Sequence, residues 1–335
     1  MKKLRIGFLS TANIGRTNWQ AIAASRHCVV SAVASRELAR SRKFISECQR
    51  DTPLGYTPEA FGSYHELLAS ERVDSVYVPL PTAMREEIVV RAANAGKHVL
   101  CEKPCASNVG ELEAMISACK KNGVQFMDGV MFMHNARLSK IRKELDAGSI
   151  GRIKRITSQF SFCGSKDFHR TNIRVNGSLE PLGCLGDLGW YCIRITLWTM
   201  KWEMPRRIEA RLIAGAENDS KVPVEFSGEL FFGGGVSAAF YCSFLTGLHQ
   251  WVDVSGTGGH LQLDGFVRPP KAPQLVFELN HRLVKTSGAW DAQQVNMFDN
   301  FARQIFSGKL NEEWPVWSLK TQQVTNACLE AARKP

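Results

Sequence analysis

Short apolar runs alternate with helix-like segments through the first 128 residues of this 335-residue chain, and this alternation restricts the possible folds most strongly. Each helix returns the chain to the starting edge of the sheet, so the strands on either side of it pair in parallel. The pattern therefore predicts an α/β fold of the Rossmann type, a doubly wound parallel sheet with helices on both faces. The expected strands cover residues 4–9, 28–34, 74–80, 99–101 and 124–127, and the expected helices cover 14–25, 37–49, 83–95 and 108–123.

Beyond residue 128 apolar side chains recur at every second position, as they do in half-buried strands. Several of these runs are joined by glycine turns, and they predict a large, open, mostly antiparallel sheet in an α+β domain. Because the chain is too long for one average core, we expect two domains, 1–128 and 129–315, with a C-terminal helix 318–333 that packs back on the first. The expected strands of the second domain cover 153–162, 208–214, 224–232, 236–244, 249–254, 260–263 and 275–279.

The composition is that of a soluble globular protein, with 44% hydrophobic and 22% charged residues and a formal net charge of +10. No apolar run approaches the roughly 20 residues that a membrane helix needs. The first ten residues are typical of a strand rather than of a signal peptide, which predicts a cytoplasmic protein. The ten cysteines follow no metal-binding spacing and mostly lie in apolar segments, so we expect buried, reduced thiols. The basic residues are scattered, which argues against nucleic acid as a partner and suits a small anionic ligand.

The turn after the first expected strand occupies the place of a dinucleotide fingerprint, G-x-G-x-x-G. Only the third glycine, Gly15, is present, and Ser10 and Ala12 replace the other two. Small side chains still let the backbone approach a pyrophosphate, and the helix that follows offers its first N–H groups. A plain turn between a strand and a helix would have the same sequence, so both interpretations stay open at this point.

The second expected strand ends in Ser35 and Arg36, about 20 residues after the fingerprint. An acidic residue here would bind the ribose hydroxyls of NAD, whereas a guanidinium and a hydroxyl can bind the 2′-phosphate of NADP. The pair therefore favours NADP(H) as the cofactor. Ser35 can also cap the helix over residues 37–49 while Arg36 is solvated, and the two roles are compatible.

Residues 97–104, Lys-His-Val-Leu-Cys-Glu-Lys-Pro, join a buried strand to a charged pair and a proline. Glu102 and Lys103 would lie at the carboxyl end of a strand, where open α/β sheets bind ligands. Pro104 cannot continue the strand and restricts the backbone beside Lys103. A surface ion pair at the end of a strand is the structural alternative.

A second group of polar residues occurs in a helical segment at 182–194, inside the sheet domain. Asp187 and Tyr191 are four residues apart, so on a helix both project from the same face. A carboxylate and a phenol close to a lysine could form a proton relay. Alternatively, Asp187 caps the helix and Tyr191 fills the core.

Five motifs in this order resemble the glucose–fructose oxidoreductase, inositol dehydrogenase and rhizopine catabolism family over essentially the whole chain. Within it, the NADP-dependent D-xylose dehydrogenases, the dimeric dihydrodiol dehydrogenases and their plant-type relatives are the most similar. The resemblance implies that Lys103, Asp187 and Tyr191 belong to the active site. The motifs are residues 34–36, 77–82, 96–104 and 186–191 and the tail from Trp314-Pro315 to Gln322.

Other residues have expected sites because of their places in the chain. One departure from the family pattern is Arg85, which stands where a histidine is usual and would present a fixed cation to the cofactor or substrate. Residues expected to line the substrate are Phe160, Phe162, His169, Arg174, Trp190 and Arg85. Residues expected to bind the cofactor are Ser10, Ala12, Asn13, Ile14, Ser35, Arg36, Pro79, Leu80, Pro81, Thr82, Glu102 and Lys103.

Together these features predict an NADP(H)-dependent dehydrogenase or reductase acting on CH–OH groups of a small polar substrate such as a sugar or cyclic diol. Tyr191 or Lys103 would handle the hydroxyl proton, Lys103 would stabilise the alkoxide, and Asp187 would orient Lys103 or the substrate. A reductase acting on a non-sugar substrate and a dinucleotide sensor without turnover are the alternatives. Recycling of the dinucleotide within one turnover, as in NAD-dependent glycoside cleavage, fits Ser35 and Arg36 less well. The open sheet further predicts a homodimer.

Overall fold

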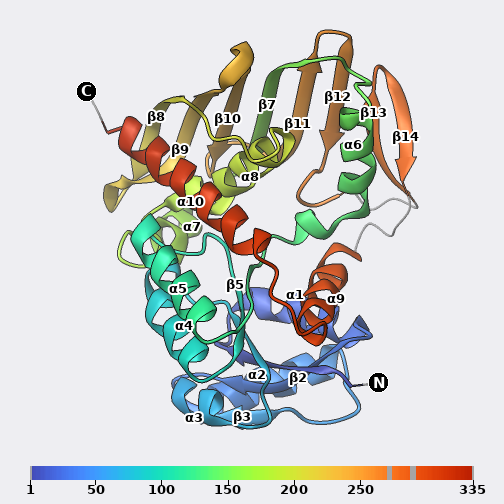
Figure 1. Ribbon diagram of the computed structural model, residues 1–335. Coiled ribbons are helices and arrows are strands. Elements are labelled where there is room, and N and C mark those ends of the chain that lie inside the picture. The colour runs from blue at the N-terminus through green and yellow to red at the C-terminus, as the bar shows by residue number, and fades with distance from the viewer. Residues whose placement is uncertain (1, 270–273, 287–291, 334–335) are drawn as a thin grey trace. The chain divides into compact units, whose positions relative to one another are not determined.

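The computed structural model describes residues 2–269, 274–286 and 292–333, which form two compact units (Figure 1). Among the described residues, the first unit comprises 2–106, 110–134 and 292–318. The second comprises 107–109, 135–269, 274–286 and 319–333. None of the helices in these described ranges is long and apolar enough to cross a membrane.

The first unit contains a parallel six-stranded sheet in the order β3-β2-β1-β4-β5-β6. The chain starts at the middle strand, builds outward to β3, and then crosses back to build β4, β5 and β6. The point where the strand order reverses lies between β1 and β4, which is where folds of this kind bind ligands. The strands are β1 (Leu4–Leu9), β2 (Cys28–Ala34), β3 (Glu59–Phe61), β4 (Ser75–Val78), β5 (His98–Cys101) and β6 (Phe126–Asp128).

Helices and short turns connect these strands, and a glycine follows the end of two of the helices. Gly96 and Gly123 take positive φ angles, 70° and 66°, just after α4 and α5, a conformation that glycine adopts without steric cost. The helices are α1 (Asn13–Ala24), α2 (Leu38–Asp51), α3 (Tyr64–Ala69), η1 (Thr82–Met84), α4 (Arg85–Asn94), α5 (Val109–Lys121) and η2 (Met131–His134).

Helix α9 (Ala292–Phe306) also belongs to the first unit, although it follows the second unit's strands in the sequence. Phe298 and Phe301 are fully buried in the same apolar core as Phe8 and Trp19. Ser25 donates a 2.5 Å hydrogen bond to Asp299. Burial of apolar area and a hydrogen bond between buried groups therefore hold α9 to this unit.

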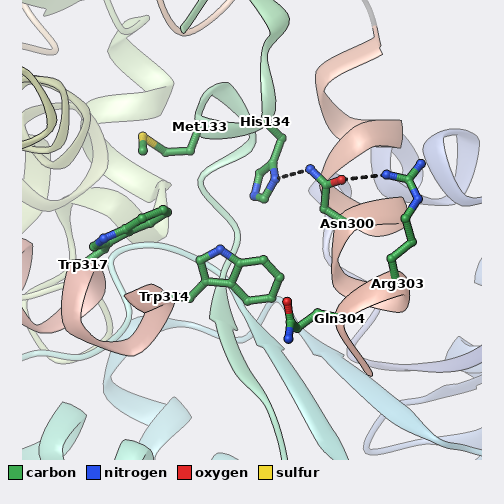
Figure 2. A pocket seen from close by; sticks show the side chains of 7 residues that line it. All are labelled: Met133, His134, Asn300, Arg303, Gln304, Trp314 and Trp317. Carbon is green, nitrogen blue, oxygen red and sulfur yellow. Dashed lines mark hydrogen bonds between the residues drawn. The ribbon is translucent and has the colours of Figure 1, made fainter. Parts of the chain in front are cut away.

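A second set of contacts ties α9 to η2. Asn296 donates to the carbonyl oxygen of His134 at 3.2 Å. Asn300 Nδ2 lies 3.0 Å from His134 Nδ1, as Figure 2 shows. Arg303 donates to Asn300 Oδ1 at 3.0 Å. A hollow of about 400 Å³ lies beside these bonds, lined by Met133, His134, Asn300, Arg303, Gln304, Trp314 and Trp317.

The second unit contains an eight-stranded sheet in the order β14-β13-β12-β11-β7-β10-β9-β8. All neighbouring pairs are antiparallel except β7 and β10, which run parallel. The first strand of the unit thus lies between β11 and β10, so the sheet is not the simple meander that the sequence suggested. The strands are β7 (Ile153–Ser161), β8 (Arg207–Ala216), β9 (Asp219–Phe231), β10 (Ser237–Ser243), β11 (His249–Gly256), β12 (Gly259–Asp264), β13 (Leu275–Leu279) and β14 (Arg282–Thr286).

Helix α8 (Trp190–Thr199) is the central helix of the second unit and packs against β7 and β10. All its residues except Trp198 are buried. Along β10 the side chains alternate, with Ala238, Phe240 and Cys242 buried, as expected for a strand with one face on a core. The other helical segments are α6 (Ala136–Asp146), α7 (Lys166–Thr171), η3 (Ile173–Val175) and η4 (Leu185–Gly189).

The observed architecture confirms the predicted fold class, a Rossmann sheet together with a large, mostly antiparallel sheet. Residues 292–315, which the sequence assigned to the second domain, group with the first unit because α9 contacts its core. Helix α10 (Glu313–Ala331) passes from the first unit to the second at Leu319. The domain boundaries at 128 and 315 and the packing of the last helix on the first domain stay predictions.

Candidate active site

The carboxyl ends of four neighbouring strands of the first unit lie in register. Leu9 is paired with Ala34, Phe8 with Tyr77, and Val78 with Cys101. The residues that follow these strand ends must therefore emerge at one edge of the sheet. They include the sequence-predicted cofactor residues after β1, β2, β4 and β5: Ser10, Ala12, Asn13, Ile14, Ser35, Arg36, Pro79, Leu80, Pro81, Thr82, Glu102 and Lys103.

The turn between β1 and α1 has the geometry of a glycine-rich turn, built with other residues. Ser10 has a φ of 132°, a conformation that normally requires glycine, and its hydroxyl accepts a 3.0 Å hydrogen bond from the amide of Ala12. No side chain caps α1, whose preceding residue is Ala12. A Cβ on Gly15 would lie 3.1 Å from Phe44, so this glycine allows α1 and α2 to pack closely. The turn therefore keeps the open helix end and the close backbone approach that a pyrophosphate needs.

Ser35 and Arg36 differ in what they can offer to a ligand. The hydroxyl of Ser35 is buried, donates to the carbonyl oxygen of Glu37 at 2.7 Å and lies 3.0 Å from the Ser41 hydroxyl. Arg36 is exposed, and no carboxylate among the described residues lies within ion-pair distance of it. Its positive charge lowers the pKa of Tyr64, a smaller effect than the burial that raises that pKa. Arg36, rather than Ser35, is thus the group available to an anion.

Glu102 is fixed from two sides beside Lys103. The Tyr77 hydroxyl donates to Glu102 Oε1 at 2.5 Å, and the amide of Lys103 donates to Glu102 Oε2 at 3.3 Å. Burial and the Glu102 carboxylate raise the pKa of Tyr77 well above its ordinary value, so this phenol stays protonated and donates. The Cβ position of Gly129 is 3.3 Å from the Glu102 carboxyl, which leaves this acid little space to move.

Arg85 does not present a free cation, contrary to the sequence-based expectation. Only 5% of the residue is exposed. Its Nε donates to the carbonyl oxygen of Leu80 at 2.7 Å, and its Nη1 donates to those of Glu102, at 2.8 Å, and Pro104. Arg85 therefore links the loop after β4 to the Glu102–Pro104 segment, and its Nε and Nη1 donate to backbone carbonyl oxygens.

In the second unit, Asp187 and Tyr191 lie on consecutive helical segments. Asp187 is in η4, a single π-helical turn, and Tyr191 is in the first turn of α8. Such π turns are rare and occur mostly at functional sites. Asp187 Oδ2 lies 2.9 Å from Arg174 Nε, and this carboxylate is the main reason that the pKa of Arg174 is raised. Arg174, named from the sequence as a substrate residue, is thus an ion-pair partner of Asp187.

The aromatic residues near this pair divide into two groups. Phe160 packs against Tyr191 with ring centroids 5.7 Å apart, and Phe162 packs against Phe168, which in turn contacts His169. Trp190 is fully buried, with the Arg194 guanidinium 5.7 Å from its ring. Trp190 is therefore a core residue and not a wall of a binding site, in contrast to what its position in the sequence suggested.

Two features of the site were not foreseen. The role of Tyr77 could have been suspected, because a phenol in an otherwise apolar buried strand needs a polar partner. The Arg174–Asp187 pair gives no such signal, since 12 residues of irregular sequence separate the two side chains.

Comparison with known proteins gives matches along most of the chain. Residues 4–130 match the sequence model described as "Oxidoreductase family, NAD-binding Rossmann fold", and residues 138–262 match the GFO/IDH/MocA C-terminal domain. A D-xylose 1-dehydrogenase (NADP(+)) of Haloferax volcanii is 32% identical, with 98% of this chain and 97% of that protein aligned. A bovine trans-1,2-dihydrobenzene-1,2-diol dehydrogenase is 29% identical over 78% of this chain and 74% of its own.

Solved structures agree with these matches. A 3-ketoreductase from Actinomadura kijaniata, crystallised with NADP and TDP-benzene, superposes with a TM-score of 0.86 at 27% identity, covering 99% of this chain and 98% of that one. Variants of that ketoreductase with a lysine changed to alanine and a tyrosine changed to phenylalanine are also similar in structure. With both domain models matched in order and a relative of 32% identity aligned end to end, this chain belongs to the GFO/IDH/MocA oxidoreductase family.

Proposed function

We propose that this protein uses NADP(H) to interconvert a secondary alcohol and a carbonyl group on a small polar substrate, such as a sugar, a keto-sugar or a cyclic diol. The observation that carries this proposal is the edge of the first unit's sheet. There, an uncapped helix end, an exposed arginine and the Glu102–Lys103 segment follow strands that are in register.

The residues present fit such a cofactor. The turn at Ser10 and Ala12 exposes backbone without bulky side chains, and α1 offers its first amides to a pyrophosphate. Arg36 suits a 2′-phosphate, and no acidic side chain occupies its position. The names of the Haloferax dehydrogenase and the Actinomadura ketoreductase complex both include NADP, which supports the choice.

When bound, NADP⁺ supplies the acceptor for the hydride that leaves the substrate carbon. In that direction, Tyr191 in its phenolate form takes the proton of the substrate hydroxyl and becomes the neutral phenol, and the Lys103 ammonium stabilises the developing alkoxide. Asp187, held by Arg174, orients the substrate hydroxyl. In the reverse direction Tyr191 returns the proton to the new hydroxyl oxygen.

The test is a screen of pentoses, hexoses, cyclic diols and keto-sugars with NADP⁺ and NADPH, followed by three variants: Lys103→Met, Tyr191→Phe and the double variant. Loss of positioned acid–base catalysis costs about 10²–10⁴-fold in rate. If both groups act on one proton, the double variant is little slower than the slower single variant.

Exposed Lys121 and Tyr56 provide matched controls, Lys121→Met and Tyr56→Phe, which should keep wild-type rates.

All variants should still bind NADPH, because neither side chain is assigned to the phosphates. A Lys103→Met protein that binds NADPH and turns over at nearly the wild-type rate would overturn the mechanism. A wild-type protein that binds NADPH but oxidises and reduces nothing in the screen would instead point to a sensor.

The setting in which this chemistry takes place is part of the proposal. We infer a cytoplasmic homodimer that pairs through the open sheet of the second unit. All ten cysteines are free thiols and nine of them are buried, which suits a reducing compartment.

A further inference from the structure

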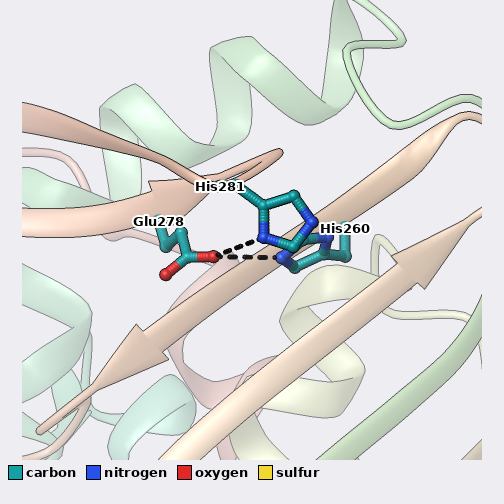
Figure 3. A group of neighbouring side chains, drawn as sticks. All are labelled: His260, Glu278 and His281. Atoms are coloured by element: carbon teal, nitrogen blue, oxygen red, sulfur yellow. Dashed lines mark hydrogen bonds and ion pairs between the residues drawn. The ribbon is translucent and has the colours of Figure 1, made fainter.

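Three side chains gather near the last hairpin of the second unit, apart from the residues assigned to catalysis. They are His260 on β12, Glu278 on β13 and His281 in the turn before β14 (Figure 3). One ligand atom of each, a ring nitrogen or a carboxylate oxygen, lies within 4.8 Å of the others. We propose that these residues form a binding site for a divalent transition-metal ion such as Zn²⁺.

The donor set is the first argument. Two imidazole nitrogens and one carboxylate oxygen are ligands that Zn²⁺ prefers, and the same set with a water holds zinc in well-known hydrolases. Glu278 Oε1 lies 3.2 Å from His260 Nε2 and 3.5 Å from His281 Nδ1. Bonds of about 2.0–2.1 Å at tetrahedral angles place neighbouring ligand atoms roughly 3.4 Å apart. Two of the three distances between ligand atoms are therefore already close to those of a tetrahedral zinc site.

The charge around Glu278 is the second argument. Among the described residues, no lysine or arginine lies within ion-pair distance of its carboxylate. The ionisable groups that do lie within that distance are the two imidazoles. Without a metal, each ring nitrogen can donate a proton to the same carboxylate oxygen. With a metal, each imidazole shifts its proton to the other ring nitrogen and offers a lone pair instead.

The backbone fixes the three residues in this arrangement. Asn280 binds both backbone groups of His260: its amide donates to the His260 carbonyl oxygen at 3.0 Å, and its Oδ1 accepts from the His260 amide at 2.9 Å. Its Nδ2 also donates to the carbonyl oxygen of Ser149 at 3.1 Å. The turn is therefore attached to β12 before any metal binds.

His281 occupies a position at which glycine would be the ordinary choice. Asn280 and His281 have φ angles of 49° and 63°, as in a two-residue type I′ turn, where the second residue is commonly glycine. The side chain of His281 is 87% exposed and contributes little to the core. The His281 ring lies against that of His260, with centroids 4.6 Å apart, and an imidazole held there at a position favouring glycine is consistent with a role as a ligand.

The site would connect two hairpins at the edge of the sheet. His260 belongs to the hairpin of β11 and β12, and Glu278 and His281 to the hairpin of β13 and β14. A bound metal would then stabilise the attachment of the edge hairpin, since a ligand that binds only the folded state raises its stability.

The experiment is a calorimetric titration with ZnCl₂ at slightly alkaline pH, carried out on the tag-free protein after treatment with a chelator. The same titration is carried out on three variants, His260→Ala, His281→Gly and Glu278→Gln. One Zn²⁺ per chain is expected, with affinity falling at least about 10- to 100-fold in each variant, since even outer-shell changes cost that much. His249→Ala removes an exposed histidine of the neighbouring strand β11 and should leave the affinity unchanged.

Glu278→Gln keeps the side-chain volume, and His281→Gly suits the turn, so both variants should fold even if His260→Ala does not. Absorption bands of tetrahedral Co²⁺ in the wild type, lost in these variants, would support the site independently. The proposal is overturned if Zn²⁺ does not bind, if one ion binds per two chains, or if Glu278→Gln and His281→Gly bind as tightly as the wild type.

Discussion

Arg36 is the residue on which we propose that the choice of dinucleotide depends. It is exposed after β2, while the hydroxyl of Ser35 is engaged with Glu37 and Ser41. Replacing Arg36 with alanine should remove a charge-assisted contact worth roughly 1.5–3 kcal/mol. We expect the KM for NADPH to rise about ten- to a hundredfold while that for NADH stays nearly constant. Arg50→Ala, at the far end of α2, is the control, and an unchanged preference in Arg36→Ala would refute the assignment.

Ser10 is strained at the position of the fingerprint's first glycine. Its φ of 132° costs a residue with a side chain about 1–3 kcal/mol, against a hydrogen bond to Ala12 worth about 0.5–1.5 kcal/mol. Ser10→Gly should therefore raise the free energy of unfolding by about 1 kcal/mol. Urea denaturation followed by tryptophan fluorescence measures the change. A less stable variant would mean that the hydroxyl contributes more than the strain costs.

At the scale of elements, Arg85 connects two loops at the end of the first unit's sheet. It donates to backbone oxygens of Leu80, Glu102 and Pro104. Arg85→Met would leave these buried acceptors without their partner, and we expect a loss of about 2–5 kcal/mol in stability. Arg85→Lys keeps the charge and some of the bonds, so its loss should be smaller.

The position of Lys103 should depend on the same connection. In Arg85→Lys, kcat for the reaction identified by the screen should fall while the affinity for NADPH, measured by fluorescence, changes little. Equal stability and equal kcat in wild type and Arg85→Met would show that the arginine does not hold this segment.

Much of the fold and the positions of some candidate site residues could be predicted from the sequence, for reasons that differ between elements. β1, β2 and β10 have strong apolar runs or clean alternation, which period-based reasoning detects. β3 has three residues and β14 is mostly exposed, so neither produces such a signal, and both were missed. The position of β7 between β11 and β10 depends on pairing across more than 80 residues, which local pattern does not encode.

The site residues follow the same rule. Ser35, Arg36, Glu102 and Lys103 could be named because they follow predictable strand ends. The buried donors of Arg85 could not, because only the tertiary structure decides whether an arginine faces backbone or solvent. The roles of Lys103, Asp187 and Tyr191 in catalysis stay predictions.

At the scale of the whole molecule, the eight-stranded sheet should bring two copies together. Helix α8 covers one face at β7 and β10, whereas the other face carries half-buried side chains such as Ala239 and Tyr241. Light scattering on a sizing column should give about twice the chain mass of 37.3 kDa. Ala239→Arg should yield a folded monomer, while Glu113→Arg, at an exposed position of α5, should remain dimeric. A wild-type monomer at micromolar concentration would contradict the model of pairing.

The return of residues 292–318 to the first unit limits how genes of this family can recombine. A single breakpoint near residue 134 would join the Rossmann strands of one parent to α9 of another. Phe298 and Phe301 would then have to fill cavities shaped by foreign neighbours around Phe8 and Trp19, and a mismatch of one methylene in such a core is already costly. Viable chimaeras should therefore inherit residues 2–134 and 292–318 from the same parent. The two gene segments that encode these residues should then be exchanged together, although they are far apart in the gene.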